Sequence, residues 1–346
     1  MVKVYQWAVV GAGPAGIAAT GQLIDHGIPP SDIIWIDPKF QVGDFGLKWQ
    51  KVSSNTKVDL FNRFFETCRA FDYEKAPKFT IQTLNSADTC LLNFANQPLQ
   101  WITENLRKKV TSIESKVIGL KLENRRWILS LPQRTILARN VIVAPGAEPK
   151  SLNIPSVEEI PLEQALDPSQ LTQLCGIDDK IAVFGSSHSA ILVLKTLMED
   201  CNVSQVYNFY RSPLSYAVYL DEWILFDDTG LKGMAAEWAK ENLDGQLPQN
   251  LRRLISSEEN LRTILPLCSK TIYATGFSSR SIPVEGMETL TYNDRSGIIA
   301  PGLFGLGIAF PEVYQDRIGI LSQRVGLWKF MEYLIRVMPI WLKYGS

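Results

Sequence analysis

The stretch VVGAGPAG, residues 9–16, decides how the chain folds. It follows an apolar run, residues 5–10, that predicts a short buried strand, and it precedes residues 17–26, which predict a helix ended by Gly27. In such a strand-turn-helix unit the first glycine permits a tight turn, and the second lets the backbone approach a pyrophosphate. The third lets the helix pack on the strand, so that phosphates meet the positive helix N-terminus. The three glycines are Gly11, Gly13 and Gly16.

An acidic residue downstream supports a dinucleotide site at this turn. The fingerprint needs a carboxylate at the end of the next strand, where it accepts hydrogen bonds from a ribose diol. IIWID, residues 33–37, predicts that strand and ends in Asp37, 21 residues after Gly16. A carboxylate disfavours a ribose 2'-phosphate here, because like charges would meet. The alternative reading is a glycine turn that holds no ligand.

A second copy of the unit begins at KIAVF, residues 180–184, and continues as GSSHSA, residues 185–190. Gly185 and Arg211 are 26 residues apart, as are Gly11 and Asp37, so we expect Arg211 to occupy the position that Asp37 holds in the first copy. An arginine there can pair with a 2'-phosphate or stack on adenine, which favours NADP over NAD.

The second copy also departs from the fingerprint. Ser187 replaces the middle glycine and puts a side chain where the backbone should approach phosphate, although its hydroxyl could donate to that phosphate; Ala190 is a tolerated variant. His188 could face a nicotinamide or phosphate, or it could pack locally without chemistry. The alternative that this second copy no longer binds a nucleotide therefore stays open. The candidate residues of this site are Gly185, Ser186, Ser187, His188, Ser189, Arg211, Thr275 and Gly276.

Two further segments complete the pattern. VIVAPG, residues 141–146, and TIYATG, residues 271–276, each predict a buried strand with a small-residue turn, one after each fingerprint. Residues 117–136 alternate like a β-meander. The sequence thus predicts an α/β protein with two Rossmann-like dinucleotide-binding domains of three layers. We expect the second domain, residues 156–280, to be inserted into a discontinuous first domain, residues 1–155 and 281–346.

This order of elements resembles the flavoproteins with two dinucleotide-binding domains, the class of thioredoxin reductases, flavin-containing monooxygenases and ornithine and lysine N-hydroxylases. The resemblance rests on GAGPAG, Asp37, the meander closed by VIVAPG, GSSHSA, IYATG and PGLFGLG at residues 301–307, and it spans nearly the whole chain. It implies that the first site binds FAD and the second NAD(P)H. The implied FAD residues are Gly11, Gly13, Pro14, Ala15, Gly16, Asp37, Lys39, Gly43, Gly46, Lys48, Trp49, Val117, Pro145, Gly146, Gly307 and Ile308.

Among these, Val117 stands where the family contacts adenine, and residues 40–56 resemble the segment that approaches the flavin ring in monooxygenases. Ile308 replaces an aspartate that often follows this glycine, a departure shared with the monooxygenase branch. Trp49 could equally be a core aromatic.

Several activities are disfavoured. Five scattered cysteines form no CxxC pair, which argues against a disulfide reductase and a zinc site, and fits a reducing, cytoplasmic compartment. The FxGxxxHxxx(Y/F) monooxygenase signature is absent too. A net charge of -1 gives no support to nucleic-acid binding.

The remaining expectations concern activity and contacts. We expect an FAD-dependent, NAD(P)H-reduced oxidoreductase acting on a small molecule, with no metal. The alternatives are a non-catalytic FAD protein with a vestigial second domain, and a reductase with a non-thiol acceptor.

Segment 216–238 could line the interdomain cleft, with Tyr216, Tyr219 and Asp221 as possible substrate contacts. We expect a helix to begin at residue 316 and to run within residues 316–344, with its N-terminus pointing at the FAD phosphates. The aromatic-rich end of this segment could pack on the FAD domain, form a dimer contact or lie on a membrane. No apolar run is long enough for a membrane span.

Overall fold

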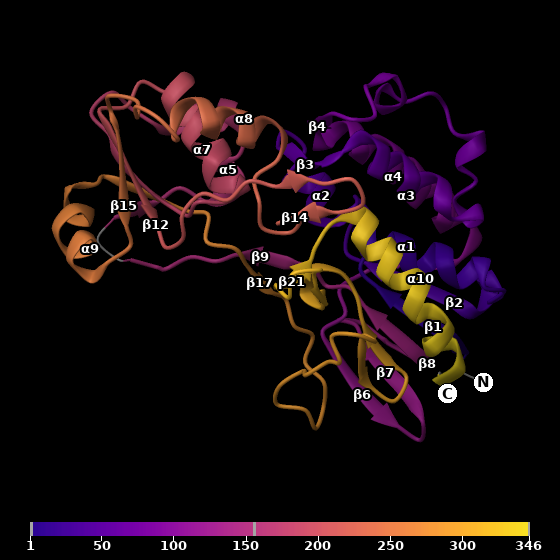
Figure 1. Ribbon diagram of the computed structural model, residues 1–346. Coiled ribbons are helices and arrows are strands. Elements are labelled where there is room, and N and C mark those ends of the chain that lie inside the picture. Colours follow the sequence, from indigo (N-terminus) through magenta and orange to yellow (C-terminus); the bar gives the residue numbers. More distant parts are fainter. Residues whose placement is uncertain (1–2, 155–156, 345–346) are drawn as a thin grey trace.

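A computed structural model of the chain describes residues 3–154 and 157–344. Two sheets lie in separate lobes, the first mixed and the second parallel (Figure 1). The first sheet has the order β18-β19-β8-β1-β2-β5, with β7 on part of β8 and β6 on β7; the second has the order β10-β16-β11-β12-β15. The first sheet takes strands from both ends of the chain, and the second takes strands from the middle.

The strands of the first sheet are β1 (Val4–Val10), β2 (Ile33–Asp37), β5 (Thr111–Glu114), β6 (Gly119–Glu123), β7 (Arg126–Ser130), β8 (Thr135–Val143), β18 (Ile298–Ala300) and β19 (Leu303–Gly305). Those of the second are β10 (Glu158–Glu159), β11 (Lys180–Phe184), β12 (Gln205–Tyr210), β15 (Leu251–Ile255) and β16 (Lys270–Tyr273). Four two-stranded ribbons are β3 (Ser53–Lys57) with β4 (Thr89–Leu91), β9 (Ala147–Pro149) with β17 (Phe277–Ser279), β13 (Val218–Tyr219) with β14 (Ile224–Leu225), and β20 (Glu312–Gln315) with β21 (Leu321–Arg324).

The α-helices are α1 (Pro14–Asp25), α2 (Gly43–Leu47), α3 (Val58–Thr67), α4 (Leu92–Lys109), α5 (Leu162–Ala165), α6 (Pro168–Leu174), α7 (His188–Glu199), α8 (Gly233–Asn242), α9 (Glu258–Ile264) and α10 (Leu327–Tyr344). Short 3₁₀ turns are η1 (Pro30–Asp32), η2 (Arg69–Phe71), η3 (Tyr73–Lys75), η4 (Thr80–Thr83), η5 (Leu265–Leu267) and η6 (Gly307–Ala309). No helix in the described part of the chain is long and apolar enough to span a membrane.

Strand β1 shows why the first lobe has three layers. Successive side chains of a strand point to opposite faces of the sheet. Trp7 and Val9 pack into a core shared with the helices, whereas Ala8 and Val10 pack into a second core shared with β6, β7 and Trp127. The meander predicted over residues 117–136 is confirmed, and its third strand continues as the strand of VIVAPG, because β8 is one strand.

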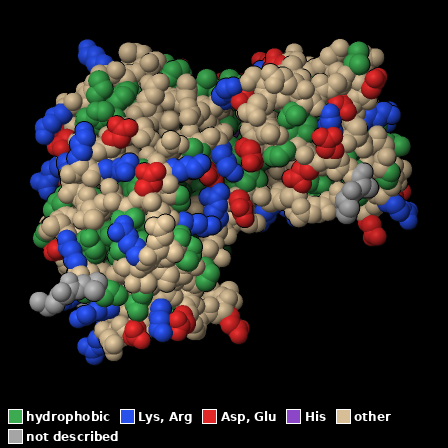
Figure 2. Space-filling model, turned by 180° about the vertical axis from the view of Figure 1, so that it is seen from behind, with side chains coloured by type: hydrophobic (Ala, Val, Ile, Leu, Met, Phe, Trp, Pro, Cys, Tyr) green, Lys and Arg blue, Asp and Glu red, His purple; other side chains and the backbone are tan. Residues whose placement is uncertain are grey.

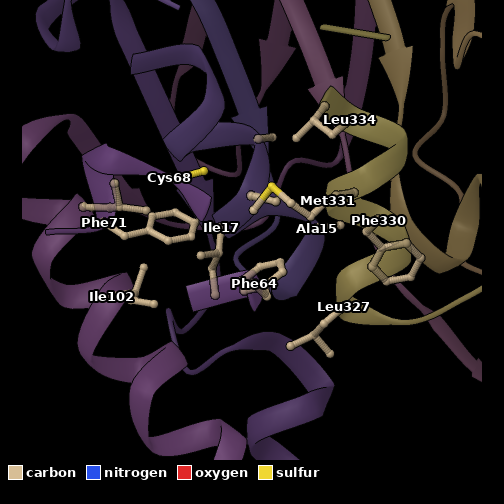
Figure 3. Close-up of a cluster of buried hydrophobic side chains, with 14 of the residues drawn as sticks. Ala15, Ile17, Phe64, Cys68, Phe71, Ile102, Leu327, Phe330, Met331 and Leu334 are labelled. Atoms are coloured by element: carbon tan, nitrogen blue, oxygen red, sulfur yellow. The ribbon is translucent and has the colours of Figure 1, made fainter. Parts of the chain in front are cut away.

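Helices α1, α3, α4 and α10 meet over the other face of this sheet. Figure 3 shows Ile17, Phe64, Ile102 and Met331 from these helices converging in one cluster. Burying four such side chains contributes about 1.5–3 kcal/mol each to the hydrophobic free energy. The C-terminal helix thus packs on the first lobe, and its position is fixed by the core.

The C-terminal helix begins later than the sequence predicts. Residues 312–324 form the β20–β21 hairpin, and α10 starts at Leu327. The Asp316 carboxylate accepts hydrogen bonds from the backbone N–H groups of Ile318 and Ile320, and Gly319 has φ +90°, so this segment closes a tight turn. The prediction of a helix from Asp316 was wrong because an aspartate and a glycine at these positions stabilise a turn.

The two lobes are joined by the β9–β17 ribbon, in which the outgoing and returning chains pair antiparallel. From behind, the same two lobes are seen with Lys, Arg, Asp and Glu side chains intermingled on the surface (Figure 2). The domain limits at residues 155 and 281 stay predictions, and residues 155 and 156 lie outside the described part of the chain.

Candidate dinucleotide and active site

A cavity of about 1270 Å³ opens where β1, β2 and β8 end. It is lined by Gly11, Asp37 and Gly146 of the first lobe and also by His188 of the second. Ligands of open α/β sheets bind outside the carboxyl ends of the strands, so the position suits a dinucleotide.

The three glycines of the first turn have different reasons to be glycine. A Cβ on Gly11, at φ +105°, would lie 2.3 Å from the Ala144 carbonyl oxygen, and one on Gly16 would lie 1.9 Å from the Gly11 carbonyl oxygen. A Cβ on Gly13 would meet only the Val42 carbonyl oxygen, at 3.9 Å. The fold therefore requires the first and third glycines, whereas the space at Gly13 is free for a ligand such as a pyrophosphate.

Helix α1 begins at this turn without a capping side chain. The first backbone N–H groups of a helix have no partner within the helix and carry partial positive charge. Here they lie beside Gly13 and Pro14, both of which line the cavity. This arrangement fits a bound phosphate.

Asp37 is buried at the end of β2. One carboxylate oxygen accepts a hydrogen bond from the N–H of Ala12 at 2.8 Å; the other accepts hydrogen bonds from the N–H groups of Lys39 and Phe40 at 2.8 and 2.7 Å. Asp37 therefore holds the turn as well as lining the cavity, which places its carboxylate where a ribose diol could donate to it.

The predicted FAD residues divide between wall and framework. Those that line the cavity are Gly11, Gly13, Pro14, Asp37, Lys39, Gly43, Lys48, Trp49, Val117, Pro145, Gly146 and Ile308. Those behind the wall are Ala15, Gly16, Gly46 and Gly307. A Cβ on Gly46 would lie 2.3 Å from the Gln41 carbonyl oxygen, and one on Gly307 2.7 Å from the Ala15 side chain, so both allow close packing.

Of the residues predicted for the second site, His188 and Ser189 line the cavity. Gly185, at φ +128°, repeats Gly11, since a Cβ on it would lie 2.4 Å from the Ala274 carbonyl oxygen. Gly276, with φ +98°, has open space around it, and Thr275 precedes it with a buried hydroxyl that has no hydrogen-bond partner in the described residues.

The register expected for Arg211 was wrong by one residue. Gly11 donates its N–H to the Ile36 carbonyl, and Gly185 donates its N–H to the Phe209 carbonyl. The strand pairs Val10 with Ile36 and Phe184 with Phe209 agree. Tyr210 is therefore the counterpart of Asp37, because the second unit is one residue shorter between turn and strand end. Arg211 follows it and is exposed.

Arg253 on the neighbouring strand β15 was not anticipated. Its guanidinium lies over the Tyr210 ring at 4.7 Å, and its Nε donates a hydrogen bond to the Asn208 side-chain oxygen at 3.0 Å. Its Nη2 is buried and has no partner among the described residues. Burial lowers the pKa of Arg253. Spacing along the chain gave no signal for it, because β15 joins the sheet through a long connection.

His188 connects the two lobes. Its Nε2 lies 2.8 Å from the Ser53 carbonyl oxygen. A carbonyl oxygen can only accept, so Nε2 carries the hydrogen. Burial lowers the pKa of His188, ahead of the opposing effect of this hydrogen bond, and the ring is neutral at pH 7. His188 therefore makes a hydrogen bond from the second lobe to the backbone of the first.

Segment 216–238 lines the cavity through Asp228, a residue that the sequence analysis did not name. Tyr216, Tyr219 and Asp221 do not line the cavity; Asp228 does, together with Gln323 of β21. Tyr219 lies under the Lys57 ammonium at 4.3 Å. The prediction that this segment borders the cleft identified the element but not the residue.

Comparison with known proteins gives three results. No protein-family model matches the chain. Monooxygenase AgnR1 of Paecilomyces divaricatus is 34% identical, with 96% of this chain and 97% of that protein covered. Among solved structures, a flavin-containing monooxygenase from Stenotrophomonas maltophilia has a TM-score of 0.67 at 14% identity, covering 100% of both chains.

Two further structures share the fold. An ornithine N-hydroxylase from Kutzneria sp. 744 has a TM-score of 0.66 at 11% identity, covering 99% of this chain and 100% of that one. Thioredoxin reductase of Lactococcus lactis has a TM-score of 0.58 at 12% identity, covering 99% of both chains. The predicted fold with two dinucleotide-binding domains is confirmed. The chain therefore belongs to the monooxygenase family of its 34%-identical relative, and it has the fold of flavoproteins with two dinucleotide-binding domains.

Proposed function

We propose that this protein uses NADPH and O₂ to oxygenate a small organic molecule, with FAD held at the 11–16 turn. The observation that carries the proposal is that this turn and the start of α7 line the same cavity. FAD, when bound, supplies hydride acceptance and the reaction with oxygen. The protein's own part is to hold the two cofactors and the substrate and to keep water out.

The residues of the first lobe bind and orient. The uncapped start of α1 receives the pyrophosphate beside Gly13, and Asp37 accepts from the ribose diol. Trp49 forms an edge-on contact with Phe277 of the returning strand, with ring centroids 6.0 Å apart. Both line the cavity, so apolar side chains from the two lobes close part of its wall against water.

Two arginines support the preference for NADPH. Arg253 and Arg211 flank Tyr210, the residue at the strand end that corresponds to Asp37. Because Tyr210 stands where the first copy has Asp37, no carboxylate occupies that position to repel a 2'-phosphate. Arg253 is half-buried and its buried Nη2 has no hydrogen-bond partner among the described residues, and Arg211 is exposed. A planar guanidinium suits a phosphate.

Anaerobic titration of the purified protein with NADPH and then NADH tests the proposal. We expect the oxidised-flavin absorbance to be lost with NADPH, and reoxidation by air to consume oxygen. A flavin that neither nucleotide bleaches would contradict the proposal. Bleaching followed by electron transfer to a dye, without oxygen incorporation in any product, would favour the reductase with a non-thiol acceptor.

A non-catalytic FAD protein is the second candidate. It is favoured by the contact of His188 with Ser53, which ties the start of α7 to the first lobe, and by Ser187, which replaces the middle glycine of the second turn and does not cap the helix. Binding of FAD with no binding of either nicotinamide nucleotide in equilibrium dialysis would support this candidate.

A further inference from the structure

One end of the cavity lies where the lobes meet. Five residues that line the cavity come from segments that touch there, namely Asn55 and Thr56 from β3, His188 from the start of α7, Asp228 from the loop after β14, and Gln323 from β21. His188 contacts Ser53 of β3, and Asp228 contacts Ser322 of β21. Lys39 and Lys116, which stand beside Asp37 and Val117, belong to the other part of the wall. This end is the part that both lobes build.

The carboxylate at this end is neutralised. The Asp228 side chain is only 8% exposed; it pairs with Lys329 of α10 at 2.5 Å and accepts a hydrogen bond from the Ser322 hydroxyl at 2.8 Å. Lys329 also pairs with Asp227 at 2.6 Å, and Asp227 pairs with Lys232. Two carboxylates and two ammonium groups therefore cancel within one cluster that ties the inserted segment to α10.

The histidine at this end is also uncharged. Burial lowers the pKa of His188, and the positive start of α7 and the nearby Lys232 disfavour a proton on the ring as well. A charged ligand would lose its hydration here without finding an unpaired counter-charge among the five wall residues named for this end. Such burial is costly, whereas a neutral ligand incurs no such penalty.

Apolar side chains are exposed on the rim outside this end. Val218, Tyr219 and Leu220 on the β13–β14 hairpin are 44–49% exposed, and Ile318 and Leu321 at the tip of β20–β21 are 58% and 67% exposed. Exposed apolar groups of this size, gathered in one place, mark a binding surface.

The two hairpins are held together at this rim. Arg317 pairs with Glu222 at 3.2 Å, and Ser322 donates to Asp228. Each hairpin leads directly into a wall residue, since Asp228 follows β14 and Gln323 lies in β21. The apolar rim is therefore continuous with the neutral end of the cavity.

We propose that the substrate is an uncharged, largely apolar molecule that enters the cavity between the β13–β14 and β20–β21 hairpins and lies against Asn55, Thr56 and Gln323. The proposal rests on the proposed oxygenation at this cavity. It assigns the entrance to the two hairpins and the selection against charge to the cluster of Asp227, Asp228, Lys232 and Lys329.

Three naphthalene probes of similar size test the charge preference at pH 7.5: neutral 2-naphthol, anionic 2-naphthoate and cationic 2-naphthylmethylammonium. Equilibrium dialysis against the FAD-loaded protein should give a Kd for 2-naphthol lower by on the order of tenfold than for either ion, since each ion must be buried unpaired. Equal or tighter binding of an ion would overturn the proposal.

Variants of the charged cluster sharpen the test. Lys329→Met leaves net negative charge at this end and should tighten 2-naphthylmethylammonium by on the order of tenfold. Asp228→Asn leaves net positive charge and should tighten 2-naphthoate instead. The double variant restores neutrality and should restore the preference for 2-naphthol. Unchanged preferences in both soluble single variants would overturn the role of the cluster. If one single variant does not fold, the other decides.

Leu321→Ser tests the entrance. We expect the Kd of 2-naphthol to rise about threefold to tenfold, because an exposed apolar contact is lost. Ile177→Ser is the matched control, since Ile177 is 64% exposed in the second lobe and away from the rim. Equal effects of the two substitutions would overturn the entrance. So would binding to phosphatidylcholine vesicles that Leu321→Ser abolishes, which would assign the hairpin tips to a lipid surface.

Flavin bleaching by NADPH, measured on the same samples, separates the two proposals. A protein that NADPH bleaches but that does not bind 2-naphthol contradicts the substrate class alone. A protein that binds 2-naphthol selectively but is not bleached contradicts the proposed function and leaves the neutral apolar site standing.

Discussion

The turns at 11–16 and 185–190 have similar backbones and different surroundings. Gly13 has φ −73° and ψ 179°, and Ser187 has φ −101° and ψ −173°, so the middle residue is extended in both. A side chain at a corresponding position in the next strand ties each turn: Trp35 donates to the Gly11 carbonyl at 2.8 Å, and Asn208 to the Gly185 carbonyl at 2.8 Å.

The difference lies in which positions the fold needs. Both turns keep the first glycine, because a carbonyl oxygen of the neighbouring strand end leaves no room for a Cβ. The third position is glycine in the first turn and a buried alanine, Ala190, in the second. At the middle position of the first turn, Gly13, there is room for a side chain. A glycine that the fold does not need indicates a ligand, and its replacement by Ser187 indicates a weaker or different contact.

The largest effect is expected at the third position. Gly16→Ala would put a Cβ 1.9 Å from the Gly11 carbonyl oxygen, and helix α1 would have to move from β1. We expect a loss of about 3 kcal/mol or more in the free energy of unfolding. Ala190→Gly, at the same position of the second turn, should cost only about 1 kcal/mol, since it mainly lowers helix propensity. Urea denaturation measures both; equal losses would show that the two helix starts are equally close-packed.

The next effect separates ligand from fold at the middle position. Gly13→Glu places a carboxylate in open space beside the uncapped start of α1, where it competes with a pyrophosphate. We expect the protein to fold but to lose FAD almost completely, as measured by the ratio of flavin to protein absorbance. Ser187→Glu is the counterpart, and it should leave FAD content unchanged while weakening NADPH. Full flavin occupancy in Gly13→Glu would refute the assignment of this turn.

The sequence predicted the first lobe well because its signals are local. Strand, turn and helix are contiguous around Gly11, and the strand that ends in Asp37 follows within one helix length. The need for a glycine in a turn, or the end of a strand, is indicated by the adjacent residues in the sequence. The same locality explains the correct meander and the strands at 141–143 and 270–273.

Features that depend on spatial neighbours were missed. Arg211 was placed by counting residues, but the second unit is one residue shorter between its turn and its strand end, and the pairing of Phe184 with Phe209 shows this. Arg253 and Asp228 reach their positions through long connections, so spacing carries no information about them. The segment from Asp316 was expected to be the helix that follows PGLFGLG, although its aspartate and glycine favour a turn.

A smaller effect compares the two arginines near Tyr210. Arg253→Ala should weaken NADPH more than NADH by several-fold to a hundredfold, the range of a lost charge-assisted hydrogen bond of about 1–3 kcal/mol. Arg211→Ala should have a similar but smaller effect, because Arg211 is exposed. Kd values for both nucleotides, from flavin or intrinsic fluorescence, decide it. Equal effects on NADPH and NADH would show that neither arginine reads the 2'-phosphate.

The smallest effect concerns His188, whose counterpart in the first turn, Pro14, makes no contact across the lobes by a side-chain hydrogen bond. Burial lowers the pKa of His188 below its ordinary value of 6.5. The unfolded chain therefore takes up a proton near pH 6.5 while the folded chain does not, so stability is fully present above about pH 6.5 and falls as the pH is lowered. His188→Gln keeps a donor for the Ser53 carbonyl but cannot titrate.

We therefore expect the difference in unfolding free energy between wild type and His188→Gln to fall from pH 7.5 to 5.5, with a slope of at most about 1.4 kcal/mol per pH unit. His26 and the carboxylates titrate alike in both proteins, so their effects cancel in this difference. Parallel stability profiles would mean that His188 accepts a proton without leaving Ser53. Converging profiles would mean that the start of α7 is held to the first lobe by a neutral imidazole, a contact that a nucleotide at the second turn must share or displace.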